Sequence, residues 1–299
     1  MKLQKYITCL LLTLPAHGAI SLVYNLRVAE TTKRLEINPG LRLPFLITGT
    51  ALGTFRTKYD GSTQRCGGGL LTFIYSPKNF FLRADAAVGH VSSENNGVHF
   101  SRTQTDDLLF SAGYSPRIAE NRRFTYSALL GFPTHKDKSL ENVQCGYAHY
   151  GLGGQMDGSF ALSADHVYTL RSAARCIHFF PRKAAAHVNP TNTRRFNYGL
   201  GNLVDLFIAL HRRKNDHNLE AGYNPSFFFD ARICPSFDDA VEKTNYIRNS
   251  FYGLYKYRFL IRETTCMVAG ALSYGFDATP KTFGNKRIIT AWGSWTVNF

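Results

Sequence analysis

KRIITAWGSWTVNF, residues Lys286–Phe299, is the stretch that decides how the rest of the sequence is interpreted. From Ile289 to Phe299 its odd-numbered positions carry apolar residues or glycine, and the positions between them are mostly polar. Alternation with a period of two residues is typical of a β-strand that has one apolar face. The same pattern recurs through most of the chain, so the sequence predicts an all-β protein.

This terminal stretch resembles the closing strand of bacterial outer-membrane β-barrels, which has apolar residues at alternate positions and ends in Phe. The resemblance is carried by Trp295, Val297 and Phe299. It implies a location in the outer membrane, contact with outer-membrane lipid and lipopolysaccharide, and recognition of this strand by the barrel-assembly machinery. The resemblance indicates no narrower family.

The N-terminus reads as a secretory signal peptide. Lys2 and Lys5 precede a short apolar core, and Ala16-His17-Gly18 fits a cleavage site between small residues. We therefore expect a signal peptide at 1–18, a periplasmic arm or lumen segment at 19–41, and a transmembrane barrel at 42–299. No later stretch has the roughly 20 consecutive apolar residues that a spanning helix needs.

The pattern divides the barrel into about twelve antiparallel strands, with ten or fourteen as the alternatives. At about 12–16 residues these strands are longer than usual in soluble sheets and long enough to cross a bilayer when tilted. Mostly short turns alternate with mostly longer loops, as expected for periplasmic and extracellular connections. Met156–Ser159 is expected to be a turn, and 173–194 the longest irregular loop. The expected strands are 42–57, 63–76, 80–93, 104–115, 123–134, 143–155, 160–172, 195–211, 218–230, 248–262, 264–278 and 286–299.

Charged residues at alternate positions, opposite an apolar stripe, are expected to face the lumen, because a charge facing lipid at mid-depth costs about 2–4 kcal/mol. An open lumen lined by the basic residues would attract anions, whereas a closed lumen would pair them with the acidic ones. The predicted lumen-lining residues are Arg83, Asp85, Asp165, Arg171, Asp205, Glu220, Lys256 and Arg258.

Two functions follow from this architecture. The first is a passive channel for small solutes, with a preference for anions that agrees with the formal net charge of +14. The alternative is a non-conducting surface barrel with a structural, adhesive or receptor role through its extracellular loops. The basic charge alone does not predict a nucleic-acid partner, since the sequence has no zinc motif, basic helix or aromatic–glycine RNA signature.

Neither catalysis nor a cofactor is predicted. The sequence lacks the GxSxG, HExxH, P-loop and Rossmann patterns, and Ser163 and His166 would lie on opposite faces of one strand. The cysteines form no CxxC pair, so no metal cluster is expected. Cys176 and Cys234, in two long loops expected on the same side, are the disulfide candidate.

Overall fold

The computed structural model describes most of the chain from Phe45 to Asn298. The described residues are 45–59, 61–77, 79–95, 98–119, 122–134, 149–163, 165, 167–189, 192–198, 201–233, 242–261, 264–279 and 285–298. The predicted signal peptide (1–18) and N-terminal segment (19–41) lie outside them, as do Cys234 and Phe299.

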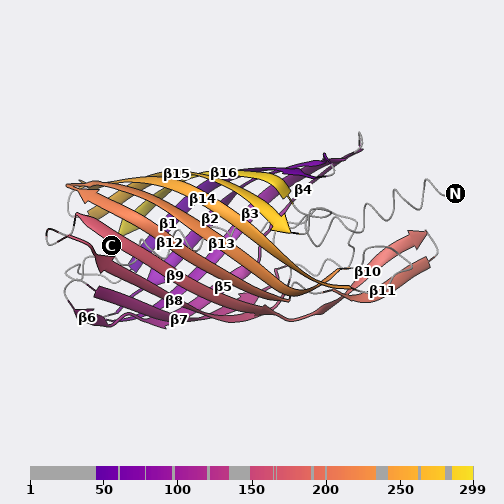
Figure 1. The fold of residues 1–299 in the computed structure, drawn as a ribbon, viewed down its shortest axis with the longest axis horizontal. Coiled ribbons are helices and arrows are strands. Elements are labelled where there is room, and N and C mark those ends of the chain that lie inside the picture. The colour runs from indigo at the N-terminus through magenta and orange to yellow at the C-terminus, as the bar shows by residue number, and fades with distance from the viewer. Residues whose placement is uncertain are drawn as a thin grey trace.

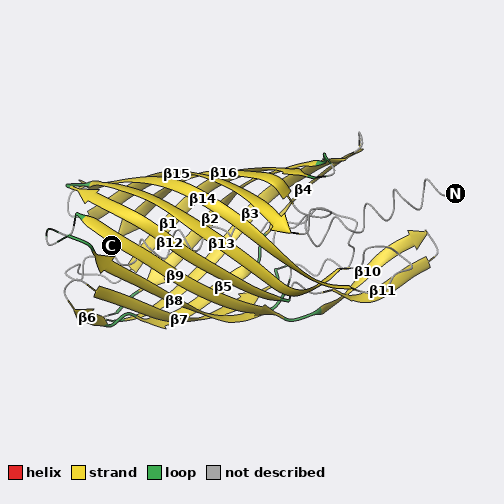
Figure 2. Ribbon diagram, in the orientation of Figure 1, coloured by secondary structure: helices red, strands yellow, loops and turns green. Residues whose placement is uncertain are grey.

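The described residues form β-strands joined by turns and loops (Figures 1 and 2). A search of these residues finds no helix that is long and apolar enough to span a membrane. The strands are β1 (Phe45–Lys58), β2 (Thr63–Tyr75), β3 (Phe80–Asn95), β4 (Val98–Thr105), β5 (Leu108–Tyr114), β6 (Arg117–Ala119), β7 (Arg122–Phe132), β8 (Gly151–Ala161), β9 (Tyr168–Phe179), β10 (Arg182–Asn189), β11 (Asn192–Tyr198), β12 (Asn202–Lys214), β13 (His217–Ile233), β14 (Glu242–Ile261), β15 (Thr264–Thr279) and β16 (Asn285–Asn298).

The main sheet closes on itself into an antiparallel barrel of twelve strands, as the sequence predicts. β1 pairs with both β2 and β16, and β2 pairs with β3, so the wall has no open side. β4 and β5 both pair with β3 and together fill one position in the wall. The side chains of Thr48 and Thr296 reinforce the closing ladder with a hydrogen bond of 2.9 Å between their hydroxyl oxygens.

The two ends of the barrel differ. The end that carries the C-terminus has the connections after β2, β5, β8, β12 and β14, several of them tight turns (Figure 1). At the opposite end β10 and β11 form a separate hairpin that projects beyond the wall. Short turns are typical of the periplasmic end of such barrels and longer loops of the extracellular end. We refer to these two ends as the periplasmic end and the extracellular end.

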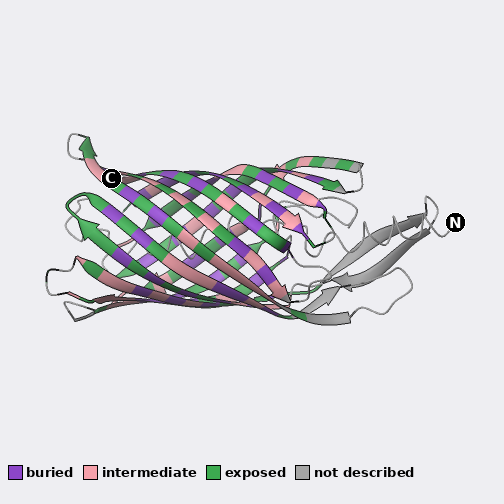
Figure 3. Cartoon of the chain, turned by 45° about the horizontal axis from the view of Figure 1, so that its top comes forward, coloured by how far each residue is buried: buried purple, intermediate pink, exposed green. Residues whose placement is uncertain are grey.

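The side chains alternate between more buried and more exposed along the long strands of the barrel wall, which gives the banded pattern of Figure 3. The exposed positions on the outer face carry large apolar residues around the barrel, among them Leu82, Leu130, Ile208, Leu272 and Trp295. In water such a surface would cause aggregation, whereas lipid solvates it. The closed wall and apolar exterior are those of an outer-membrane β-barrel.

Several predicted strand limits are wrong, and the largest differences lie between β8 and β12. Met156–Ser159 is not a turn, because β8 runs through these residues to Ala161 and β9 begins at Tyr168. The segment 173–194 is not irregular, because β9 continues to Phe179 and β10 follows. As a result β12 begins at Asn202, and Arg195 belongs to β11. In addition, β4 begins at Val98 and not at 104, and β14 begins at Glu242 and not at 248.

Two local features interrupt the regular wall. Asp106 and Asp107, both fully buried, separate β4 from β5, and the Asp106 amide donates to the carbonyl oxygen of Ala87 at 2.8 Å. The ladder between β12 and β13 is interrupted beside Pro225, which has no N–H to donate. There the side-chain amide of Asn224 donates to the carbonyl oxygen of Leu206.

Candidate functional site

The inner face of the barrel is the candidate functional site, since it carries most of the buried polar and charged side chains. Thr48, Thr50, Thr54 and Arg56 lie at alternate positions on the inner face of β1, with the apolar Leu52 between Thr50 and Thr54. Among the described residues of the wall, the buried charged side chains are Arg56, Lys58, Arg83, Asp85, Asp106, Asp107, Asp157, Arg171, Arg175, Asp205, Glu220, Lys256 and Asp277.

The densest group of charges lies on β9, β12, β13 and β14. Arg175 forms an ion pair with Asp205, the residue directly opposite it on β12. Arg171 Nη1 lies 2.7 Å from Glu220 Oε2 on β13. β12 lies between β9 and β13. Its residue Ala209 pairs with Arg171, and the short side chain of Ala209 leaves room for the Arg171–Glu220 ion pair to cross β12.

An aromatic pair borders this group. The rings of Phe207 and Tyr252 stack with their centroids 5.6 Å apart, and the Tyr252 hydroxyl donates to Glu220 Oε1 at 2.7 Å. Tyr252 fits because Gly222 has no side chain: a Cβ atom there would lie 2.5 Å from Tyr252 Cε1 and 2.8 Å from Ala209 Cβ. The absence of a side chain at Gly222 therefore positions the hydroxyl that holds Glu220.

Further pairs lie elsewhere on the wall. On β3 the Arg83 Nε donates to Asp85 Oδ2 at 2.8 Å, and the Thr72 hydroxyl donates to Asp85 Oδ1 at 2.7 Å. Toward the extracellular end Arg248 Nε donates to Asp277 Oδ1 at 2.7 Å, and the Asn285 side chain donates to Asp277 Oδ2.

These ion pairs run along the wall. Arg83 and Asp85 are two residues apart on one strand, Arg175 and Asp205 lie on adjacent strands, and so do Arg248 and Asp277. Such pairs neutralise charge on the inner face without bridging the lumen.

The structure distributes the predicted lumen residues unevenly. Arg83, Asp85, Arg171, Asp205, Glu220 and Lys256 are buried on the inner face. Asp165 is instead exposed in the turn between β8 and β9, where its carboxylate accepts a hydrogen bond from the amide of Val167. Arg258 lies near the periplasmic end, and its half-exposed side chain pairs with Asp216 in the turn between β12 and β13 at 3.2 Å.

The loop position predicted for Cys176 is wrong. Cys176 lies within β9, its side chain is exposed on the outer face, and it is a free thiol. Its predicted partner Cys234 lies outside the described residues. Within the part of the chain that the structure describes, no group of three His, Cys, Asp or Glu side chains could hold a metal ion.

Sequence reasoning missed several residues of the inner wall, namely Arg175, Asp157, Tyr252 and Asp277. Arg175 and Asp157 fell in the segments predicted as a loop and a turn. A signal for Arg175 was present, because Arg171, Ala173, Arg175 and Ile177 continue the alternation on one face.

Comparisons with known proteins agree with the architecture. The chain matches an outer-membrane channel from Pseudomonas putida F1 with a TM-score of 0.62 and 12% identity, over 88% of this chain and 100% of that one. It matches the translocator domain of the autotransporter NalP from Neisseria meningitidis with a TM-score of 0.51 and 11% identity, over 93% and 95%.

The β-domain of the Bordetella autotransporter BrkA gives a TM-score of 0.51 and 10% identity, over 86% and 100%. No protein-family model matches the chain, and neither does any curated protein. At these identities the likeness establishes the fold, which is that of the outer-membrane β-barrels.

Proposed function

We propose that this protein is a passive channel for small polar solutes in the outer membrane, with a role in transport rather than catalysis. The observation that carries the proposal is the set of charged and polar side chains on the inner face, whose ion pairs lie along the wall. A cluster of buried apolar side chains shares this face, among them Leu52, Val91 and Trp292. A charged and polar interior is typical of barrels that admit water and solutes. The likeness to a solved outer-membrane channel supports the same architecture.

The anion preference expected from the sequence gains less support. The buried basic residues of the described wall are Arg56, Lys58, Arg83, Arg171, Arg175 and Lys256, and the buried acidic ones are Asp85, Asp106, Asp107, Asp157, Asp205, Glu220 and Asp277. These two sets nearly balance. We therefore propose a weakly selective channel, in which any preference for anions comes from individual basic side chains such as Lys256.

A non-conducting surface barrel is the second candidate, and the low exposure of the inner side chains favours it. Lys256 and Asp106 are 0% exposed and Arg171 is 3% exposed, so the lumen is closely filled at their levels. A twelve-stranded barrel is narrow enough for this. For the channel we accordingly expect a low conductance.

The test is single-channel recording in a planar bilayer, with protein purified from outer membranes and a salt gradient across the bilayer. We expect discrete openings of low conductance and a reversal potential close to zero. Lys256→Met, which removes an inward positive charge, should move the reversal potential toward cation selectivity. Arg65→Met removes an equal charge from an exposed position on the outer face and should leave the reversal potential unchanged.

Absence of openings from a barrel that is demonstrably folded, by its heat-dependent mobility on a gel, would refute the channel and favour the surface barrel. An equal response to both substitutions would show that Lys256 does not line the conducting path.

The expected partners are part of the proposal. Trp295 and Val297 lie on the outer face of β16, where the barrel-assembly machinery could recognise the closing strand. Lipopolysaccharide is proposed to contact the extracellular end of the barrel, where the outer-face residues include Arg65 and Arg287.

A further inference from the structure

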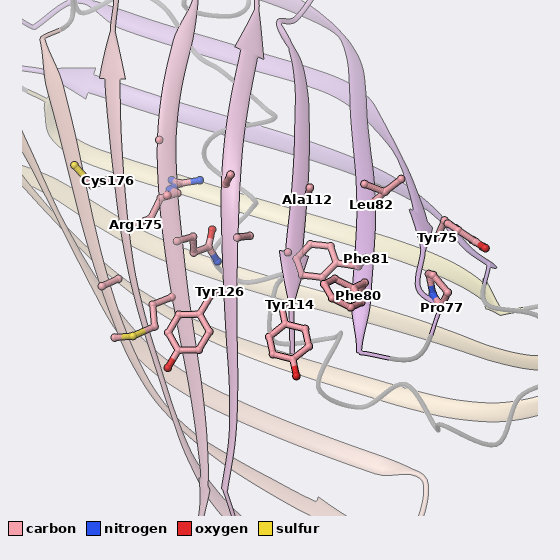
Figure 4. Close-up of a pocket in the computed structure, with 18 of the residues that line it drawn as sticks. Tyr75, Pro77, Phe80, Phe81, Leu82, Ala112, Tyr114, Tyr126, Arg175 and Cys176 are labelled. Atoms are coloured by element: carbon pink, nitrogen blue, oxygen red, sulfur yellow. The ribbon is translucent and has the colours of Figure 1, made fainter. Parts of the chain in front are cut away.

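A trench crosses the outer face of the barrel from the turn after β2, over β3, β5, β7, β8 and β9, to β12. Its floor is a row of small residues that the strand register places side by side: Ala112 pairs with Ala128, Ala128 with Gly154, and Gly154 with Cys176. The trench has a volume of about 1010 Å³ and its lining is almost entirely apolar (Figure 4). We call it the outer trench.

Larger side chains border the floor of the outer trench. On one side the register aligns Phe80, Tyr114, Tyr126 and Met156, all of them exposed. In Figure 4 the rings of Tyr114 and Tyr126 stand beside each other with their hydroxyl groups pointing the same way. Beyond the floor on the other side lie the exposed residues Phe110, Leu130 and Leu152, each two positions from a floor residue on the same strand. Phe110 and Leu130 line a neighbouring depression and not the trench itself.

The outer trench begins at the periplasmic end of the wall, where its lining includes Tyr75, Pro77 and Phe80. A second depression of about 710 Å³ shares Tyr75, Leu82, Ala112 and Ala128 with it and continues over β1 and β2. Two aromatic pairs mark this end, Phe45–Tyr75 and Phe80–Tyr114, each with ring centroids 4.9 Å apart. Tyrosine suits the boundary between lipid chains and headgroups because its ring is apolar and its hydroxyl polar.

We propose that the outer trench holds an acyl chain of a phospholipid from the periplasmic leaflet. The trench is continuous with the apolar surface of the barrel that faces lipid, and the ion pairs of Arg171 and Arg175 lie on the opposite side of the wall. A polar solute would gain little from such a lining, whereas a flexible hydrocarbon chain buries its own apolar surface there.

The dimensions agree with this occupant. From β2 to β12, where Val204 lines it, the trench crosses six strand spacings, or roughly 29 Å at about 4.8 Å each. One leaflet contributes about 15 Å of hydrocarbon thickness, and strands tilt by about 45°. A chain that follows the trench obliquely through one leaflet therefore travels roughly 21 Å, a path that fits within the length of the trench. This proposal does not depend on whether the lumen conducts.

The experiment measures the lipid that the barrel retains. Protein is refolded into vesicles of dioleoyl phosphatidylethanolamine and phosphatidylglycerol, transferred to detergent, and examined by native mass spectrometry. The trench variant is A128L/G154L, which places two leucines on the floor. At Gly154 an added Cβ lies 3.6 Å from the nearest atom, the carbonyl oxygen of Ser127, so the wall itself tolerates the change.

The matched control is A291L/G293L, which makes the same chemical change on the outer face of β16, away from the trench. At Gly293 an added Cβ lies 3.7 Å from the nearest atom, the carbonyl oxygen of Ala269. Heat-dependent mobility on a gel verifies that all three proteins are folded. We expect the wild type and the control to retain one phospholipid, and the trench variant to retain it at least about fivefold less often.

Equal retention by all three proteins would overturn the proposal, as would a wild type that retains no phospholipid. A wild type that is a dimer, without bound phospholipid, and that becomes monomeric only in the trench variant would also overturn it. That result would assign the outer trench to a second copy of the barrel.

Discussion

Gly222 supports the inner wall by leaving room for the ring of Tyr252. A Cβ atom at Gly222 would lie 2.5 Å from Tyr252 Cε1, so Gly222→Ala must displace the ring from Phe207 and its hydroxyl from Glu220. We expect a loss of about 1–3 kcal/mol in the free energy of unfolding, measured by urea titration in phospholipid vesicles.

Gly253→Ala is the control for this prediction, because an added Cβ at Gly253 meets nothing within 4 Å. Its effect on the same free energy should stay within about 0.5 kcal/mol. Equal effects of the two substitutions would mean that the Tyr252 ring adjusts without loss.

The ion pair of Arg175 and Asp205 gives a second prediction at this scale. Arg175→Met leaves the buried Asp205 carboxylate without the guanidinium that faces it and should lower the free energy of unfolding by about 3–5 kcal/mol. The double variant R175M/D205L removes both charges and should recover part of that loss. If the double variant is as unstable as the sum of the two single variants, the two side chains do not act as a pair.

The residues of the inner wall were only partly predictable. Alternation alone places Arg83, Arg171 and Glu220 on the inner face, as the structure has them. It does not say that Arg171 reaches Glu220, because that contact depends on the register of three strands and on the small residue Ala209 between them. Register is set by tertiary pairing, which one sequence does not reveal.

At the scale of the strand, each outward-facing position is expected to lie at a defined depth in the membrane. Leu272, 61% exposed near the middle of β15, should face the hydrocarbon core, whereas Leu260, 69% exposed near the end of β14, lies close to the periplasmic rim. Leu272→Lys should therefore lower the free energy of unfolding by about 2–4 kcal/mol, and Leu260→Lys by at most about 1 kcal/mol.

Urea titrations of both variants in the same vesicles would check this prediction. A larger loss from Leu260→Lys than from Leu272→Lys would mean that the membrane covers a different part of the wall.

Strand limits were the least predictable feature of the elements. Asp157-Gly158 reads as a turn in the sequence, but Asp157 is buried on the inner face and accepts hydrogen bonds from the Gln155 amide. Gly158 leaves space for the ring of Phe160, whose Cε2 would lie 3.1 Å from a Cβ at that position. Residues that are common in turns here support packing inside a strand. The sequence does not distinguish a turn from such a strand position, whereas the three-dimensional structure does.

At the scale of the whole molecule, the same strands serve two surfaces. On β8 and β9 the inward residues Gln155 and Arg175 belong to the polar wall, while the outward residues Gly154 and Cys176 form the floor of the outer trench. The alternation of a strand makes this division possible. A substitution on one face can therefore test the lipid site without changing the charges of the lumen.

The closed architecture itself was predictable, because long alternating strands that end in an apolar terminal strand have few other stable arrangements. The small-residue floor of the outer trench was not. It arises only when Ala112, Ala128 and Gly154, far apart in sequence, come side by side through the register.

The ladder between β1 and β16 also determines the order in which the barrel can form. Thr48 and Thr296, joined across it, are separated by 248 positions in the chain, whereas the other ladders join strands that are consecutive or separated only by a short insertion. Hairpins can therefore accumulate as local, low-contact-order steps, but the seam cannot be sealed until the last strand is available. Until then both edges stay exposed to pairing with other chains, so the rate of closure governs how much of the protein escapes aggregation.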